Sequence, residues 1–315
     1  MRFGLEMMRD IVETIDTDQL PYADNVVIGD NSSGKTMLLK LFIERVGKEE
    51  NVYFIDAVNR GFDVKRISKT EKKPEYKRTI LETRLRETNF NLQDSFNCYG
   101  TSTERVEMIY GLYEEEVQNL FYEMTGDQFR VLYGDPLGEV DFGEGRGLLS
   151  SGYQAIVRIF LELLYYQDME IEKRRLERAW VIVDELDEFL SPRYSAVFLN
   201  FLKKKFPWAR WLITSHSCDL VAYTQNANLV VLENGNWEII DINDYSSVSE
   251  VQIVFRRLFG APAEVEPQMN NVLRRLLNNK MNHIWGSENE RCLKQIEEQE
   301  LTASQRIIVD QIRKW

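Results

Sequence analysis

The chain has 315 residues, 43% of them hydrophobic and 29% charged, which suffices for one large globular domain with a full core. It contains no apolar run near the roughly 20 residues that cross a bilayer and no signal-peptide core, so the composition excludes a membrane-spanning segment and predicts a cytoplasmic protein. The formal charge of −12 at pH 7 disfavours non-specific attraction to nucleic acid, because phosphate binding needs lysine and arginine to displace counterions.

The predicted elements alternate between strands and helices, which is typical of an α/β fold with a mainly parallel central sheet. In chain order, the pattern predicts a helix over 5–15, a strand over 25–28, a helix over 37–46 and a strand over 52–55. Residues 61–130 are mostly polar with a helical pattern, including a helix over 106–124, and predict an inserted helical lobe.

The second half continues the alternation. A helix is expected over 155–167, buried parallel strands over 180–183 and 211–214, and a hairpin of strands 229–232 and 237–240. From residue 249 onward the pattern is helical. We therefore expect an α/β domain over residues 1–245 and a helical C-terminal extension over 246–315, whose last apolar stripe (Ile308, Ile312, Trp315) packs on the protein's own core or contacts a partner.

Two features outside the motifs bear on partners. Between residues 61 and 90 the local charge is reversed, and we expect a solvated face there, with contact to a polyanion as the alternative. The basic side chains of this segment are Lys65, Arg66, Lys69, Lys72, Lys73, Lys77, Arg78, Arg84 and Arg86. The three cysteines, Cys98, Cys218 and Cys292, lack paired spacing and predict neither a disulfide framework nor a zinc site.

A phosphate-binding motif follows the first predicted strand. Gly29-Asp30-Asn31-Ser32-Ser33-Gly34-Lys35-Thr36 matches G-x-x-x-x-G-K-T between a strand and a helix. The glycines let the backbone amides of this loop wrap around phosphates. We expect Lys35 on the β- and γ-phosphates and the Thr36 hydroxyl in one magnesium position, so the motif predicts ATP and Mg²⁺ as ligands.

An acidic pair ends the strand predicted at 180–183. Asp184 is expected to hold magnesium, directly or through water, and Glu185 to polarise the attacking water. A surface helix cap would explain such a pair equally well by itself, but the phosphate-binding motif upstream favours a nucleotide site.

A third motif, Leu149-Ser150-Ser151-Gly152-Tyr153-Gln154, precedes the predicted helix at 155. A simple helix cap would explain the serines but not their order between the phosphate loop and the acidic strand. The pattern resembles the L-S-x-G-x-Q signature of ABC-type ATPases. The resemblance implies that Ser150, Ser151, Gly152 and Gln154 bind the γ-phosphate held by an opposite subunit, in a homodimer or higher homo-oligomer. It also implies that His216 senses the γ-phosphate and that Asp187 lies in the segment crossing the dimer interface.

The chain departs from that family in two places. The glutamine loop expected after the strand at 52–55 is not evident, and Asn59 is the one candidate for a substitute magnesium contact. Only about 28 residues precede the phosphate loop and they have a helical pattern, so the adenine-stacking aromatic of transporter ATPases is not evident either.

Among ABC-type ATPases, the residues of the first and third motifs resemble those of the soluble SMC-like and OLD-like ATPases more than those of transporter subunits. The segment between the first and third motifs lacks sustained heptads, which excludes a long coiled-coil arm. The length after His216 leaves little room for a nuclease domain, so an effector would be another chain. By analogy, such ATPases stand beside nucleases or toxins in bacterial antiphage defence modules. The resemblance thus implies ATP binding and hydrolysis that drive head-to-tail closure, as a sensor or switch; the alternatives are a DNA repair or recombination ATPase and a nucleotide-bound scaffold with little turnover.

Overall fold

The computed structural model describes residues 4–47 without 18, 51–67, 79–96 without 87 and 89, 105–245 without 173, 174 and 234, and 248–258, and beyond these only parts of 272–313. The chain divides into two compact units, Met1–Phe259 and Gly260–Trp315. In the parts described, no helix combines the length and the apolar character that crossing a bilayer requires.

The first unit is built on a six-stranded sheet in the order β2-β6-β7-β1-β8-β9. Its strands are β1 (Asn25–Gly29), β2 (Val52–Ile55), β6 (Ala179–Val183), β7 (Ala209–Thr214), β8 (Asn228–Glu233) and β9 (Asn236–Asp241). Neighbouring strands are parallel from β2 to β8, and only β9 runs antiparallel to its neighbour β8. The prediction of a mixed α/β fold with a mainly parallel sheet is confirmed, as is the hairpin formed by β8 and β9.

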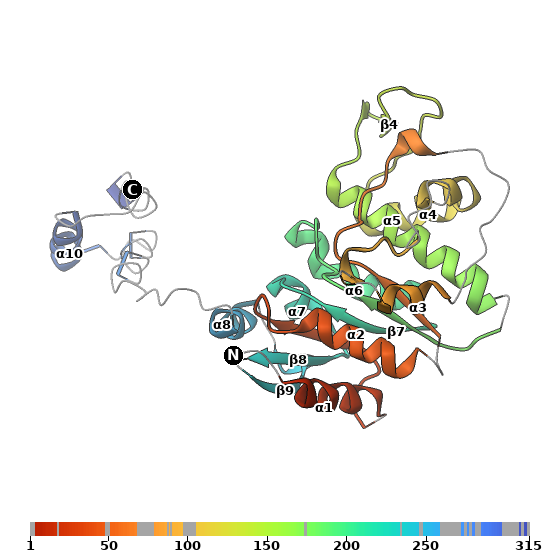
Figure 1. The fold of residues 1–315 in the computed structure, drawn as a ribbon. Coiled ribbons are helices and arrows are strands. Elements are labelled where there is room, and N and C mark those ends of the chain that lie inside the picture. Colours follow the sequence, from red (N-terminus) through yellow and green to blue (C-terminus); the bar gives the residue numbers. More distant parts are fainter. Residues whose placement is uncertain are drawn as a thin grey trace. The chain divides into compact units, whose positions relative to one another are not determined.

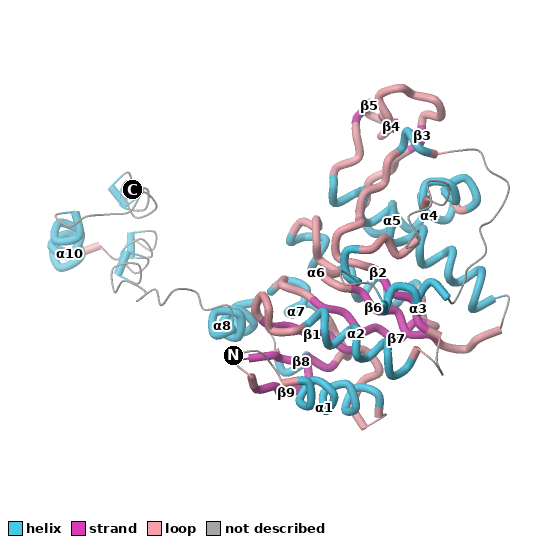
Figure 2. Tube along the Cα trace, in the orientation of Figure 1, coloured by secondary structure: helices cyan, strands magenta, loops and turns pink. Residues whose placement is uncertain are grey.

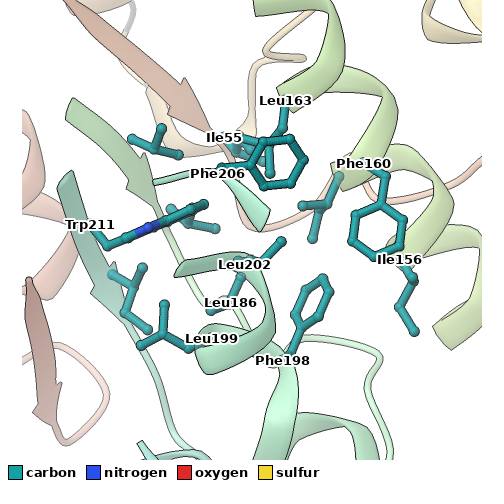
Figure 3. Close-up of a cluster of buried hydrophobic side chains, with 14 of the residues drawn as sticks. Ile55, Ile156, Phe160, Leu163, Leu186, Phe198, Leu199, Leu202, Phe206 and Trp211 are labelled. Carbon is teal, nitrogen blue, oxygen red and sulfur yellow. The ribbon is translucent and has the colours of Figure 1, made fainter. Parts of the chain in front are cut away.

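Helices cover both faces of this sheet (Figures 1 and 2). Successive β1 residues point to opposite faces: Val27 joins the cluster of α1 (Leu5–Asp16) and α2 (Lys35–Val46), while Val26 joins the cluster on the other face. That second cluster contains α5 (Ser151–Tyr166), α6 (Pro192–Lys205) and α7 (Cys218–Tyr223). Figure 3 shows its centre, where Phe160 of α5 and Phe198 and Leu202 of α6 meet Trp211 of β7. Because both faces are buried, the parallel strands have largely apolar sequences, whereas β9 at the edge is only partly buried.

The predicted lobe differs in detail from the expectation. The single helix expected over 106–124 is wrong: a 3-10 helix η3 (Val106–Leu112) is followed by α4 (Glu114–Thr125), which packs against α5 and α6. The break lies at Tyr113, whose backbone is non-helical and whose hydroxyl donates to Asp168 Oδ2 at 2.8 Å. Three glutamates, 114–116, then begin α4, where negative charge favours a helix N-terminus.

The rest of the lobe consists of short elements. A small antiparallel sheet of β3 (Arg130–Val131), β4 (Val140–Asp141) and β5 (Arg146–Gly147) follows α4. Before α4 lie η1 (Val64–Arg66), α3 (Thr79–Arg86) and η2 (Phe90–Leu92). Residues 68–78 and 97–104, which include Cys98 and five of the basic residues, lie outside the described residues.

The C-terminal region is helical where it is described. Helix α8 (Val248–Leu258) belongs to the first unit, and α10 (Ser287–Glu297) to the second. The second unit has its own apolar cluster, in which Ile312 is fully buried with Leu273 and Leu276. Burial of Ile312 agrees with packing of the terminal stripe on its own core, while Ile308 and Trp315 lie outside the described residues.

Candidate functional site

The predicted residues of the phosphate loop, the acidic pair and His216 lie at one edge of the sheet. Strands β6, β7 and β1 are neighbours and parallel, so their carboxyl ends lie side by side. The phosphate loop follows β1, the Asp184-Glu185 pair follows β6, and Ser215 and His216 follow β7. Ligands of parallel α/β sheets bind at such an edge.

The loop from Gly29 to Thr36 has the backbone of an anion-binding turn. Gly34, the N-cap of α2, has φ +101, and Ser32 has φ +66, both in the left-handed region. A Cβ on Gly29 would stand 2.9 Å from the Leu232 carbonyl oxygen, and one on Gly34 would stand 2.3 Å from Met8 Cε. The close backbone of Leu232 therefore requires glycine at position 29, whereas at position 34 the left-handed backbone requires it, because the Met8 side chain can move.

Lys35 lies inside the loop and is 6% exposed. Its Nζ donates to the carbonyl oxygens of Gly29 and Asp30, at 2.8 and 3.2 Å. Burial lowers the pKa of Lys35, although the carboxylates of Glu185 and Asp184 favour its charged form. The ammonium group thus stands where an incoming phosphate could replace two carbonyl acceptors.

Thr36 and Asp184 supply the donor set expected for magnesium. The Thr36 hydroxyl donates to Asp184 Oδ2 at 2.9 Å, and Asp184 is 1% exposed. A hydroxyl and a carboxylate are oxygen ligands of the kind that Mg²⁺ takes, with phosphates and waters completing its shell. Among the residues that the structure describes, no three His, Cys, Asp or Glu side chains form a protein-only metal site, and a nucleotide-bound Mg²⁺ requires none.

Thr214 joins these groups and was not among the predicted residues. Its Oγ1 donates to Asp184 Oδ1 and accepts from the Glu185 backbone N–H, both at 2.7 Å, and the residue is fully buried. Glu185 has a left-handed backbone, φ +53, which costs energy for a residue with a side chain. The one signal in the sequence was a hydroxyl residue at the end of a buried strand.

Glu185 and His216 face each other across the site, with Nε2 and Oε1 3.7 Å apart. Burial, followed by the nearby Asp184 carboxylate, raises the pKa of Glu185. Burial, followed by the Lys35 charge, lowers the pKa of His216, so the imidazole is neutral at pH 7 and the contact is not an ion pair. A raised carboxyl pKa suits a group that accepts a proton from water.

The signature-like segment caps α5. Ser150 is the N-cap and its Oγ accepts from the Tyr153 N–H at 3.2 Å, while Ser151 is exposed. A Cβ on Gly152 would stand 2.9 Å from the Phe189 carbonyl oxygen, so this turn packs closely on the segment after Glu185. Gln154 is turned inward: its side chain accepts from the Phe62 N–H at 3.3 Å and donates to the Leu149 carbonyl at 2.9 Å.

Asp187 lies in the segment that packs on Gly152. Its Oδ1 is buried and has no hydrogen-bond partner within the described part of the chain. Its charge raises the pKa of Glu185 further, although less than burial and Asp184 do.

The segment after β2 reaches the site through Arg60, not through Asn59. Asn59 Nδ2 donates to Asp56 Oδ1 at 3.0 Å and to the Leu92 carbonyl at 2.8 Å. Arg60 is 1% exposed, and its Nη2 donates to the Asp184 carbonyl at 2.9 Å. Asn59, the candidate for a magnesium contact, therefore bonds elsewhere, and the buried Arg60 contacts the Asp184 backbone in this segment.

The basic segment is not a uniform surface patch. Arg84 is buried, lies 3.8 Å from Asp56 Oδ2 and donates to the Phe90 carbonyl, and Arg66 pairs with Asp63. Because it is buried, Arg84 does not contribute to a surface that could bind a polyanion. Lys69, Lys72, Lys73, Lys77 and Arg78 lie outside the described residues.

A cavity of about 420 Å³ opens at the phosphate loop. Its walls are residues 31–37 of the loop and α2, Glu185 from the end of β6, and Leu5 and Met8 of α1. Residues 150–154 are described but do not line it, so the single chain does not bring its own signature-like segment to its phosphate loop.

No family model matches the chain, and no curated protein matches it in sequence. Solved structures similar to it include an SMC head domain from Thermotoga maritima, at 15% identity and a TM-score of 0.31 over 43% of this chain and 50% of that one. The chain thus spans half the length of that SMC head domain. An SMC ATPase described for its ATP-driven dimerisation and DNA-stimulated activation matches at 12% identity and a TM-score of 0.32, over 48% of this chain and 96% of that one. A metal-chelate type ABC transporter in an inward-facing conformation matches at 13% identity and a TM-score of 0.36, over 75% of this chain and 79% of that one. Likenesses at this level assign the chain to no family.

Proposed function

We propose that this chain is an ABC-type ATPase that works in head-to-tail pairs. The observation that carries the proposal is the division of the site within one chain. The phosphate loop and Glu185 line one cavity, and Asp184 is hydrogen-bonded to Thr36 of that loop, while the exposed Ser151 at the N-terminus of α5 does not line the cavity. A second copy would bring its own Ser151 and Gly152, with the positive end of α5, to the γ-phosphate.

In such a pair the chain's own residues divide the work. The loop amides and Lys35 hold the β- and γ-phosphates, with Lys35 exchanging its two carbonyl acceptors for phosphate oxygens. Glu185 accepts a proton from the water that attacks the γ-phosphorus, and the bond from that phosphorus to the β–γ bridging oxygen breaks, which leaves ADP and phosphate. The neutral His216 can donate a hydrogen bond to a γ-phosphate oxygen. Mg²⁺, held by Thr36 and Asp184, would supply charge neutralisation on the phosphates.

We infer a switch role for this cycle. ATP favours the closed pair only because the trans contact to the γ-phosphate exists in that state and not in the open one. The output would pass to a separate effector chain, and the antiphage context stays a prediction drawn from the resemblance.

The test is trans-complementation between two inactive variants, Lys35→Ala and Ser151→Arg. Each alone should lose ATP turnover. In a head-to-tail pair that mixes them, one site carries both lesions and the other carries none. An equal mixture should regain about a quarter of wild-type turnover, because half of the pairs are mixed and each has one intact site of two.

Three other results would count against the proposal. A mixture as inactive as its components would contradict the shared site. Wild-type protein that binds ATP without turnover would favour the scaffold function. Turnover that requires DNA and is lost with the basic residues between 61 and 90 would favour the repair ATPase. As an independent measurement, Glu185→Gln should accumulate an ATP-dependent dimer by light scattering.

A further inference from the structure

The cavity at the phosphate loop has apolar walls, which a site for phosphate alone would not need. Leu5 and Met8 belong to α1, and Met37 follows Thr36 in the first turn of α2. Leu5 and Met37 are 52% and 47% exposed, beside a loop built for a strongly charged ligand.

Helix α1 is held rigidly against the loop. Its Ile11, Val12 and Ile15 are buried with residues of α2 in one cluster. Met8, 3% exposed, lies directly over Gly34, and Leu5 stands one turn before it on the same side of the helix. Figure 1 shows α1 running beside α2. The apolar wall is therefore a fixed part of the cavity.

The geometry of hydrolysis fixes which end of a nucleotide meets this wall. The triphosphate occupies the amides of the loop, and Glu185 must stand at the γ-phosphate, where water attacks. The nucleoside leaves the loop in the other direction. Apart from Glu185, the walls outside the loop are Leu5, Met8 and Met37. Thioether and aliphatic groups pack well on the face of an aromatic base.

We propose that Leu5, Met8 and Met37 form the nucleoside subsite and that it accepts nucleoside triphosphates without reading the base edge. The inference rests on the proposed function and specifies its substrate. A site distinguishes adenine from guanine by hydrogen bonds to the edge of the base, whereas apolar contact separates similar ligands by about 10- to 200-fold. The described walls beyond the loop and Glu185 are apolar at all three positions.

The experiment is calorimetric binding to the full chain with Mg²⁺, using ATP, GTP and inorganic tripolyphosphate. Wild-type protein should bind ATP and GTP with affinities within about 200-fold of each other. Leu5→Ser and Met8→Ala should each weaken both nucleotides by roughly 3- to 30-fold and leave tripolyphosphate unchanged, since only the nucleoside loses contacts. Leu5 is exposed, so its substitution does not threaten folding, and Leu137→Ser, at an exposed leucine that does not line the cavity, is the control.

Two outcomes would overturn the subsite while sparing the phosphate site. One is a preference for ATP over GTP above about 1,000-fold, which requires polar reading of the base. The other is an equal loss of tripolyphosphate and nucleotide in the Leu5 and Met8 variants. If wild-type protein binds neither tripolyphosphate nor nucleotide, the proposed function fails together with the subsite.

Discussion

At the scale of single residues, the site depends on one hydroxyl that bonds to both acidic residues. Thr214 lies on β7, between β6 and β1, and bonds to the Asp184 carboxylate and to the Glu185 N–H. It therefore fixes the Asp184 carboxylate and the backbone of Glu185 together, the two residues proposed to hold Mg²⁺ and to accept a proton from water. The unfavourable backbone of Glu185 is maintained by this bond.

Thr214→Val should lower ATP turnover about 10- to 100-fold while ATP binding changes little, because the base loses its orientation but the phosphate loop remains. It should also cost about 1–3 kcal/mol of stability, since it leaves the Glu185 N–H without its partner. Steady-state kinetics and urea unfolding measure the two effects. Thr214→Ser restores the hydroxyl and should restore both values; a Ser variant as inactive as Val would contradict the role of the hydroxyl.

Glu185 should make the nucleotide-free protein less stable at neutral pH. Its pKa is raised, chiefly by burial, so the folded state holds the proton more tightly than the unfolded state. Stability is therefore lost as the pH rises through the folded pKa. Glu185→Gln should melt at a higher temperature than wild type at pH 8, and the difference should shrink as the pH falls toward the ordinary value of 4.5. Scanning calorimetry of both proteins from pH 5 to 8, with Glu144→Gln as an exposed control, measures this; a difference that grows in acid would refute it.

The site residues that could be predicted from the sequence are those that belong to contiguous motifs. Lys35, Thr36, Asp184 and Glu185 follow strands in recognisable order, and the structure brings them to one sheet edge. Thr214 and Arg60 have no motif, because their roles come from hydrogen bonds between strands that are remote in sequence. The apolar residues of α1 gave a helical pattern but no indication that Met8 would cover Gly34.

At the scale of elements, a buried charged network joins β2 and the segment after it to Asp94 and to α5. Arg158 of α5 donates to Glu162 Oε1 at 2.9 Å and to Asp94 at 2.7 Å, and Glu162 also accepts from the Tyr53 hydroxyl at 2.8 Å. Arg158 also donates to the Gly61 carbonyl at 3.2 Å. The helix that begins with Ser151 is thus tied to the segment whose Arg60 contacts Asp184.

Glu162→Ala should destabilise the protein by about 3–5 kcal/mol, because Arg158 and Tyr53 each lose a buried partner. Urea unfolding measures the loss. The matched control is Glu123→Ala, which removes an ion pair with Lys205 from the surface, where Glu123 is 49% exposed, and should cost about 1 kcal/mol or less. Equal losses for the two variants would show that the network contributes nothing beyond surface charge.

Elements were predictable where periodicity or apolar runs were long enough. The parallel strands of the central sheet are buried on both faces and are evident as apolar runs rich in β-branched residues. Strands β3 to β5 have two residues each and leave no periodic pattern. The break at Tyr113 is set by a tertiary hydrogen bond to Asp168, 55 residues away, which local pattern does not encode.

At the scale of the whole molecule, the two units have separate apolar clusters. The described residues of the second unit form one cluster with no member from the first. Leu276→Ala should therefore lower the free energy of unfolding of the second unit alone, by about 2–5 kcal/mol. Leu202→Ala should lower that of the first unit by a similar amount. Calorimetry should resolve two transitions that respond separately. A single transition shifted by both variants would mean that the units unfold together.

The place of β1 in the sheet has a consequence for synthesis on the ribosome. The strand that carries the phosphate loop lies between β7 and β8, which are translated more than 180 residues after it. At about 5–20 residues per second, the nascent β1 waits roughly 10–40 s for its neighbours. During that interval its apolar residues and unpaired edges are exposed, so a chaperone requirement should track translation speed. The proposed nucleotide would not assist the early steps of folding, because the residues of its candidate site come together only after the last parallel strands have emerged.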